Sequence, residues 1–282
     1  NFAHGDVFMV GTFVSFFAIS LLDLHRWPLT AWPGMNPTAA TVIGTVTVIL
    51  ASMVTCALLA VTIERFAYRP LRAMPRITAL ITAIGVSFFL EYFGGLPFVF
   101  TNNYITYPRP FEVFVLNADM VPPVWLAVMW GICALAAIVY GVLRMLGRRG
   151  NIRAQAWQRN PLLQFGMLFG GFLGVVLTIV WLAPRFIGTA FELTASNAML
   201  VVMGLSIILL VVLQYIVRYT RTGKAMRASA YDKPTSRLMG INVDMVIAMT
   251  FALAGGLAGA GGVLFATSYN RIHHLMGIIP GL

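Results

Sequence analysis

The sequence predicts an all-α membrane protein, a polytopic bundle of transmembrane helices. Apolar residues make up 59% of the 282 positions and charged residues only 10%, whereas about a quarter of an ordinary soluble domain is charged. The apolar residues occur in continuous blocks, each close to the ~20 residues that a helix needs to cross the hydrocarbon core of a bilayer. Long continuous blocks favour helices, because a β-barrel would show alternating segments of ~10 residues.

Seven such blocks follow one another along the chain, and each is expected to cross the membrane once. The chain begins inside a motif and ends just after a Pro-Gly pair, so we expect a fragment that is truncated at both ends. All of residues 1–282 are expected to form one transmembrane domain. The blocks lie at residues 7–22, 38–63, 77–93, 122–143, 162–184, 196–217 and 246–268.

The net charge of +10 is explained by topology. Fifteen of the 19 Lys and Arg residues fall in the loops after the second, fourth and sixth blocks, and the other loops hold only Arg26, Arg109, Arg185 and Arg271. The positive-inside rule places the Arg-rich loops in the cytoplasm. The expected surroundings are therefore a lipid bilayer, and no nucleic-acid partner is expected.

The sequence has no motif for nucleotide, metal or nucleophilic chemistry. Gly223 and Lys224 are followed by alanine and lack the upstream glycine of a phosphate-binding loop. No H-E-x-x-H, C-x-x-C or G-x-S-x-G pattern occurs, and both cysteines, Cys56 and Cys133, lie within apolar blocks. We therefore expect no catalytic residue, no metal and no cofactor, and no enzyme activity in this chain.

The third Arg-rich loop, residues 218–244, is predicted to fold as two short helices on the cytoplasmic face. Asp232 or Lys233, with Pro234 in the first turn, favours the start of a second helix. Gly240 favours its left-handed end, and Asn242 or Asp244 can cap the next span. Composition alone leaves two readings of this loop open, a docking surface and a solvated basic loop. The docking reading rests on small residues (Ala225, Ala228, Ser229, Ala230) beside apolar ones (Met226, Leu238, Met239, Ile241).

Five segments resemble the permease subunits of high-affinity branched-chain amino acid ABC importers. They are Asn-Phe-Ala-His-Gly-Asp at residues 1–6, Glu-Arg-Phe-Ala-Tyr-Arg-Pro-Leu-Arg at 64–72, Thr-Ala-Ile-Gly-Val-Ser at 82–87, Gly-Lys-Ala-Met-Arg-Ala at 223–228, and Leu-Met-Gly-Ile-Asn-Val-Asp at 238–244. They occur in the family's order, and the resemblance covers about residues 1–110 and 199–282. Residues 143–196 depart from the family pattern and are expected to be an inserted helical pair.

The resemblance implies a multi-pass subunit of the bacterial cytoplasmic membrane. Its expected partners are a second related permease, two cytoplasmic ABC ATPases that hydrolyse the ATP, and a periplasmic substrate-binding protein. Residues 218–244 would be the coupling loop that enters a cleft of an ATPase. The residues expected to make this contact are Gly223, Lys224, Ala225, Met226, Arg227, Ala228, Asp232, Leu238, Met239, Gly240 and Ile241.

The resemblance implies the transport of branched-chain or other neutral amino acids, and the scarcity of charged residues within the spans suits an apolar substrate. A related urea or short-amide permease stays open as an alternative, as does a non-transport membrane scaffold; a passive channel would need no docking loop. The first motif is either a structured entrance near the pathway or a simple capped helix start. The candidate pathway residues are Asn1, His4, Gly5 and Asp6 in that motif and Thr82, Gly85 and Ser87 in the third span.

Overall fold

The computed structural model describes residues 3–72, 74–101, 103–111, 115–116, 130–131, 134, 138–142, 144–145, 178 and 195–277. The chain divides into two compact units. The first contains Asn1–Glu112 and Tyr215–Leu282, and the second contains Val113–Gln214. The features that bear on function lie in the first unit.

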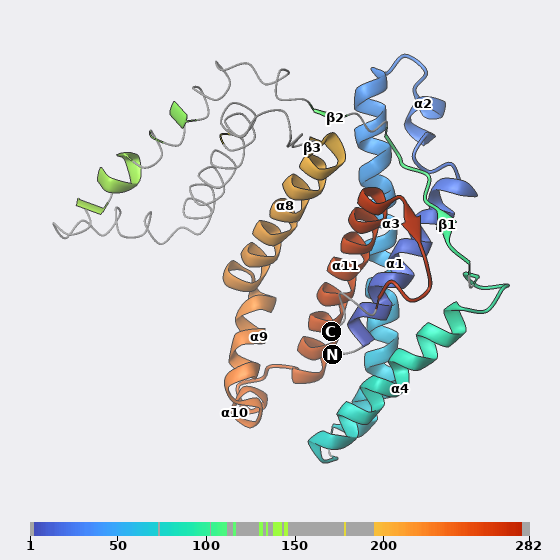
Figure 1. Cartoon of the computed structure of the whole chain (residues 1–282). Helices are drawn as coiled ribbons and strands as arrows, with labels where there is room; N and C mark the ends of the chain where they lie inside the picture. The colour runs from blue at the N-terminus through green and yellow to red at the C-terminus, as the bar shows by residue number, and fades with distance from the viewer. Residues whose placement is uncertain are drawn as a thin grey trace. The chain divides into compact units, whose positions relative to one another are not determined.

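The first unit is built around four apolar helices (Figure 1). They are α1 (Ala3–Ser20), α3 (Pro37–Ile63), α4 (Arg76–Gly94) and α11 (Val243–Tyr269). Helices α3, α4 and α11 are long and apolar enough to cross a membrane, and α1 is apolar but shorter. The short helix α2 (Trp27–Ala31) lies on the connection between α1 and α3.

Helices α1, α3 and α11 pack closely because glycines lie where their backbones meet. A methyl group on Gly259 of α11 would lie 2.7 Å from the Ser52 carbonyl oxygen of α3. A methyl group on Gly11 of α1 would lie 2.6 Å from the Gly259 Cα. Small residues let helix backbones approach in this way in membranes, where water does not drive helices together. These three helices form the buried centre of the unit.

The two ends of this bundle separate the loops as the charge alternation predicts. At one end, α3 continues into a π-helical turn (Glu64–Tyr68) and a 3-10 turn (Arg69–Leu71), and this Arg-rich segment contacts the start of α11. At the other end, β1 (Ile105–Thr106) pairs antiparallel with β4 (Arg271–Ile272). The guanidinium of Arg109 there donates hydrogen bonds to the carbonyl oxygens of Thr267 and Ser268, at 3.0 and 3.3 Å.

Most of α8 (Asn197–Tyr219) belongs to the second unit, and its residues Val201–Tyr219 are long and apolar enough to span a membrane. In the same unit, β2 (Val115–Leu116) pairs antiparallel with β3 (Ala195–Ser196). Helices are thus present at five of the seven predicted blocks. The block at 122–143 is described only at residues 130–131, 134 and 138–142, which are helical, and the block at 162–184 only at residue 178. The predicted inserted pair at 143–196 lies almost entirely outside the described residues. The mostly helical membrane fold is confirmed, and a total of seven spans stays a prediction.

Candidate functional site: a capped helical corner and a polar contact inside the bundle

The predicted pair of short helices is present as α9 (Arg221–Tyr231) and α10 (Lys233–Leu238). Each helix start is capped by a side-chain oxygen that accepts a hydrogen bond from a backbone N–H in the first turn. The Thr220 hydroxyl accepts from Gly223 at 3.0 Å, the Asp232 carboxylate accepts from Thr235 at 3.2 Å, and the Asn242 amide oxygen accepts from Met245 at 3.1 Å. Three successive caps hold the loop in a defined shape.

The end of α10 also has the predicted left-handed glycine. Gly240 has φ +79°, a conformation that other residues adopt at a cost. Its N–H donates to the Arg237 carbonyl, and the Ile241 N–H donates to the Ser236 carbonyl, both at 3.0 Å. This pair of bonds is the Schellman motif, which satisfies carbonyl groups that the helix end leaves without partners. The chain is thereby turned directly into α11.

Helix α9 is fastened to the last turn of α8, which belongs to the first unit. A methyl group on Gly223 would lie 2.3 Å from the carbonyl oxygens of both Ile216 and Val217, so only glycine fits there. The Arg227 guanidinium donates to the carbonyl oxygens of Val217 and Arg218, at 3.0 and 3.2 Å. Gly223 therefore packs closely against the end of α8, and its predicted contact with a partner stays a prediction.

Large side chains project into open space at both ends of α10. Tyr231 is 96% exposed, Leu238 is 87% exposed and Met239 is 78% exposed. Leu238 and Met239 are among the predicted apolar contacts, whereas Tyr231 is not. The signal for it was available, because an aromatic residue directly before the helix-capping Asp232 must lie at the bend. We refer to Tyr231, Leu238 and Met239 as the exposed corner.

The other predicted contact residues divide between the surface and the interior of the loop. Lys224, Arg227 and Ala228 are exposed, whereas Ala225, Met226 and Ile241 are half-buried. Ser229 is 5% exposed, and its hydroxyl has no hydrogen-bond partner among the described residues. The small residues of α9 therefore serve partly to let the loop fold onto the bundle.

Asp232 is stabilised as a carboxylate at this corner. The Thr235 hydroxyl donates a hydrogen bond to it, and so does the Thr235 backbone N–H. Both bonds favour the charged form, so the pKa of Asp232 lies below its ordinary value. The cap is fully formed at neutral pH.

A cluster of charged side chains joins the loop to the ends of α3 and α11. Arg72 pairs with Glu64 at the end of α3 and with Asp244 in the first turn of α11. Arg69 and Arg237 approach the same Asp244 carboxylate, at 3.6 and 3.8 Å. Glu64 is buried, with 3% of its surface exposed. We refer to these five residues as the charge cluster.

The candidate pathway residues of the first motif meet the third span inside the bundle. Asp6 of α1 is 4% exposed and accepts a hydrogen bond from the Ser87 hydroxyl of α4. Gly5 is buried, and its carbonyl oxygen would lie 2.3 Å from a methyl group on Gly277. The motif residues Asp6 and Ser87, which are 81 positions apart in sequence, are therefore in direct contact.

The remaining candidate pathway residues do not join this contact. The Thr82 hydroxyl donates to the Thr78 carbonyl one turn earlier in α4, at 2.8 Å, which is a local helix contact. Gly85 is exposed, and a methyl group on it would have open space around it. Asn1 lies outside the described residues.

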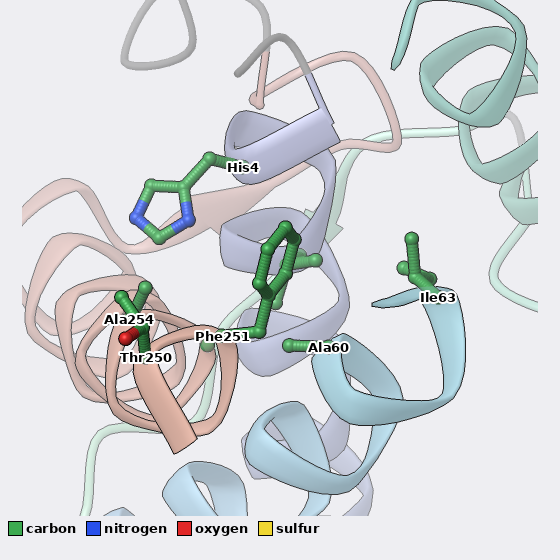
Figure 2. Close-up of a pocket in the computed structure, with 8 residues that line it drawn as sticks. His4, Ala60, Ile63, Thr250, Phe251 and Ala254 are labelled. Atoms are coloured by element: carbon green, nitrogen blue, oxygen red, sulfur yellow. The ribbon is translucent and has the colours of Figure 1, made fainter. Parts of the chain in front are cut away.

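A cavity of about 330 Å³ is lined by residues of α1, α3 and α11 (Figure 2). Its volume is at the lower end of the ~300–1,000 Å³ typical of small-molecule sites. His4 and Thr250 provide its polar side chains, and the rest of the lining is apolar. The lining residues are His4, Val7, Ala60, Ile63, Thr250, Phe251, Ala254 and Gly255.

Long apolar helices and a capped helical loop beside Arg-rich segments define a multi-pass helical membrane protein. The family follows from comparison with known proteins. Residues 113–279 match the model of the family described as branched-chain amino acid transport system / permease component, so the chain belongs to this family.

The curated relatives agree with this assignment over the whole chain. The chain is 27% identical to the high-affinity branched-chain amino acid transport system permease protein LivH of Salmonella typhimurium and 26% identical to LivH of Escherichia coli K12. It is 28% identical to the corresponding permease protein BraD of Pseudomonas aeruginosa. The alignments include 100% of this chain but 65%, 65% and 66% of the relatives' lengths, respectively. No solved structure matches the chain significantly.

Proposed function

We propose that this chain is a membrane-spanning subunit of an ATP-driven importer that moves branched-chain or other neutral amino acids across the bacterial cytoplasmic membrane. Family membership and the names of the relatives support the transport role and the amino acid substrate. In this proposal the chain pairs with a second related permease and two cytoplasmic ATPases, which hydrolyse the ATP. A periplasmic binding protein delivers the substrate.

The exposed corner is the observation that carries this proposal. Tyr231, Leu238 and Met239 hold most of their surface in open space, although burying a large apolar side chain is worth about 1.5–3 kcal/mol. A solvated loop that only fixed topology would not need three such side chains exposed at the two ends of α10. A protein partner that covers them explains their exposure, and the ATPase is the partner that this family's loop implies.

The caps at Thr220, Asp232 and Asn242 give the corner the stiffness that a coupling element needs. A ligand or partner can shift a conformational equilibrium only if it contacts the two states differently. In our proposal the open and the closed conformation of the ATPase make different contacts with the exposed corner. The rigid loop carries that difference to the helices that it adjoins.

The cavity and the Asp6–Ser87 contact are our candidates for a part of the substrate pathway. The cavity's apolar lining suits an aliphatic side chain, while His4 and Thr250 offer polar groups to the backbone of an amino acid. Gly5, Thr82 and Gly85 belong to the same proposal through their motifs.

The proposal is tested by purifying the full-length protein with the products of its neighbouring genes. We expect an ATPase to co-purify, and we expect Tyr231→Glu or Leu238→Glu to remove it because a carboxylate would be buried in the contact. Phe98→Glu is the matched control, since Phe98 is 80% exposed but lies in the loop after α4, at the opposite end of the bundle. Retention of the ATPase and of amino acid uptake by both corner variants would refute the docking proposal.

A further inference from the structure

The segment from Glu64 to Arg72 clasps α11 at two points. The Tyr68 and Phe251 rings lie 5.4 Å apart between centroids, which places an aromatic contact about two helical turns into α11. Arg72 and Arg69 hold Asp244 at the helix start. Side-chain contacts therefore join the segment at the end of α3 to the first turns of α11.

Arg72 is the only member of the charge cluster, among the described residues, that contacts both a buried and a half-buried carboxylate. Glu64 is 3% exposed and Asp244 is 41% exposed, and the Arg72 guanidinium reaches them through different nitrogens, Nη2 and Nη1. A planar guanidinium presents five N–H donors in a fixed arrangement, so it can hold two carboxylates in one geometry, which a lysine ammonium does less well.

The charge cluster also reaches the coupling loop. Arg237 of α10 lies 3.8 Å from the Asp244 carboxylate to which Arg72 binds. Arg237 is two residues from Met239 and one from Leu238, which belong to the exposed corner. A displacement of the exposed corner would therefore be passed by Arg237 of α10 to Asp244, and from Asp244 through Arg72 to Glu64.

We propose that Arg72 is a positioning residue that transmits movement of α9 and α10 to α3, so that α3 and the start of α11 move as one piece when the ATPase acts. The inference rests on the proposed transport function and adds the route by which the movement enters the bundle. It predicts that losing Arg72 leaves the exposed corner able to bind the ATPase. What fails is the conversion of ATP hydrolysis into transport.

The neighbouring Arg65 shows that membrane topology alone does not account for this arrangement. Arg65 lies in the same segment and carries the same charge, but it is exposed and makes no ion pair among the described residues. Positive charge on the cytoplasmic side requires no particular partner. Exposed ion pairs also add little stability, typically 0–1 kcal/mol. The burial of Glu64 under Arg72 is therefore a specific feature of this position.

The test uses the complete importer in proteoliposomes, with loaded binding protein, and measures amino acid uptake and ATP hydrolysis together. For Arg72→Gln we expect normal co-purification of the ATPase but about a tenfold loss of substrate molecules imported per ATP hydrolysed, within the range of ordinary coupling effects. Arg72→Lys should recover part of that ratio. Arg65→Gln is the control for charge loss in the same segment and should keep the wild-type ratio.

A second variant separates transmission from simple stability. Arg72→Gln alone leaves the buried Glu64 carboxylate without its partner, whereas Glu64→Gln combined with Arg72→Gln removes both charges. We expect the double variant to regain thermal stability but to stay uncoupled. A double variant with wild-type stability and a wild-type uptake-to-ATP ratio would overturn the inference. If the unaltered complex binds no ATPase or imports nothing, the proposed function itself fails instead.

Discussion

The Ser52 hydroxyl of α3 donates a hydrogen bond to the Gly11 carbonyl oxygen of α1, at 2.8 Å, and lies 3.2 Å from the Gly259 carbonyl oxygen of α11. Three helices therefore meet at one fully buried side chain. The contact is possible only because both partners are glycines whose backbones are unobstructed. It locates the tightest packing of the first unit at the crossing of α1, α3 and α11.

Gly259→Val should destabilise the protein by overfilling this crossing. The first added carbon would already lie 2.7 Å from the Ser52 carbonyl oxygen, which is backbone and cannot rotate away. Overpacking of this kind typically costs about 1–3 kcal/mol. Thermal unfolding of the purified protein in detergent should show a lower Tm. Gly204→Ala is the control, because a methyl group there meets nothing within 4 Å; an equal drop in Tm for both variants would contradict the packing account.

Ser87→Ala should weaken the link between α1 and α4. It removes the hydroxyl that donates to the buried Asp6 carboxylate, and an unsatisfied buried group costs about 1–3 kcal/mol. We expect a lower Tm and reduced uptake, with the ATPase still bound. Ser87→Thr keeps the hydroxyl and should retain more stability than Ser87→Ala. If the two variants are equally stable, the hydrogen bond contributes nothing measurable.

Asp232→Ala should loosen α10 without unfolding the bundle, because it removes the cap that orders the exposed corner. Faster amide exchange at Ser236 and Arg237 would report this, while Asp232→Asn, which keeps an acceptor, should show slow exchange. The pKa of Asp232 is lowered by folding, so its stabilising effect is present above the ordinary aspartate pKa and is lost as pH falls through the lowered value. Unchanged exchange in the alanine variant, at neutral pH, would count against the cap.

Ala254→Phe should block transport if the cavity belongs to the substrate pathway. The new ring would occupy space between α11 and α3 that Ala60 and Ile63 line. Uptake is expected to fall sharply, while Tm and ATPase binding should stay near wild type because the volume filled is already empty. Ala248→Phe on the same helix, away from the cavity lining, provides the comparison. Full uptake by Ala254→Phe would remove the cavity from the proposed pathway.

Local features of the fold could be predicted from sequence because each depends on neighbouring residues. The apolar block at 38–63 nearly reproduces α3, and the order Asp232, Pro234, Gly240, Asn242 predicted the start and end of α10 and the cap of α11. These signals act within a few positions of the chain. Helix caps and left-handed glycines have the same local meaning in any protein.

Contacts between distant segments could not be predicted in the same way. Arg72 and Asp244 are 172 positions apart, and a basic loop residue gives no sign of which carboxylate it will meet. Gly223 matched the family motif as a contact residue, yet its lack of a side chain serves packing against Ile216 and Val217. Both facts depend on how helices are placed in three dimensions, which hydropathy and motif order do not encode.

The central claim is that the α9–α10 corner faces the cytoplasm, and cysteine labelling in intact cells tests it most directly. With Cys56 and Cys133 replaced by alanine, Lys233→Cys and Tyr104→Cys place single thiols at exposed positions on opposite ends of the bundle. A maleimide that cannot cross the cytoplasmic membrane should modify the cysteine at 104 in intact cells and the cysteine at 233 only after permeabilisation. Modification of the cysteine at 233 in intact cells would contradict the topology and the coupling role with it.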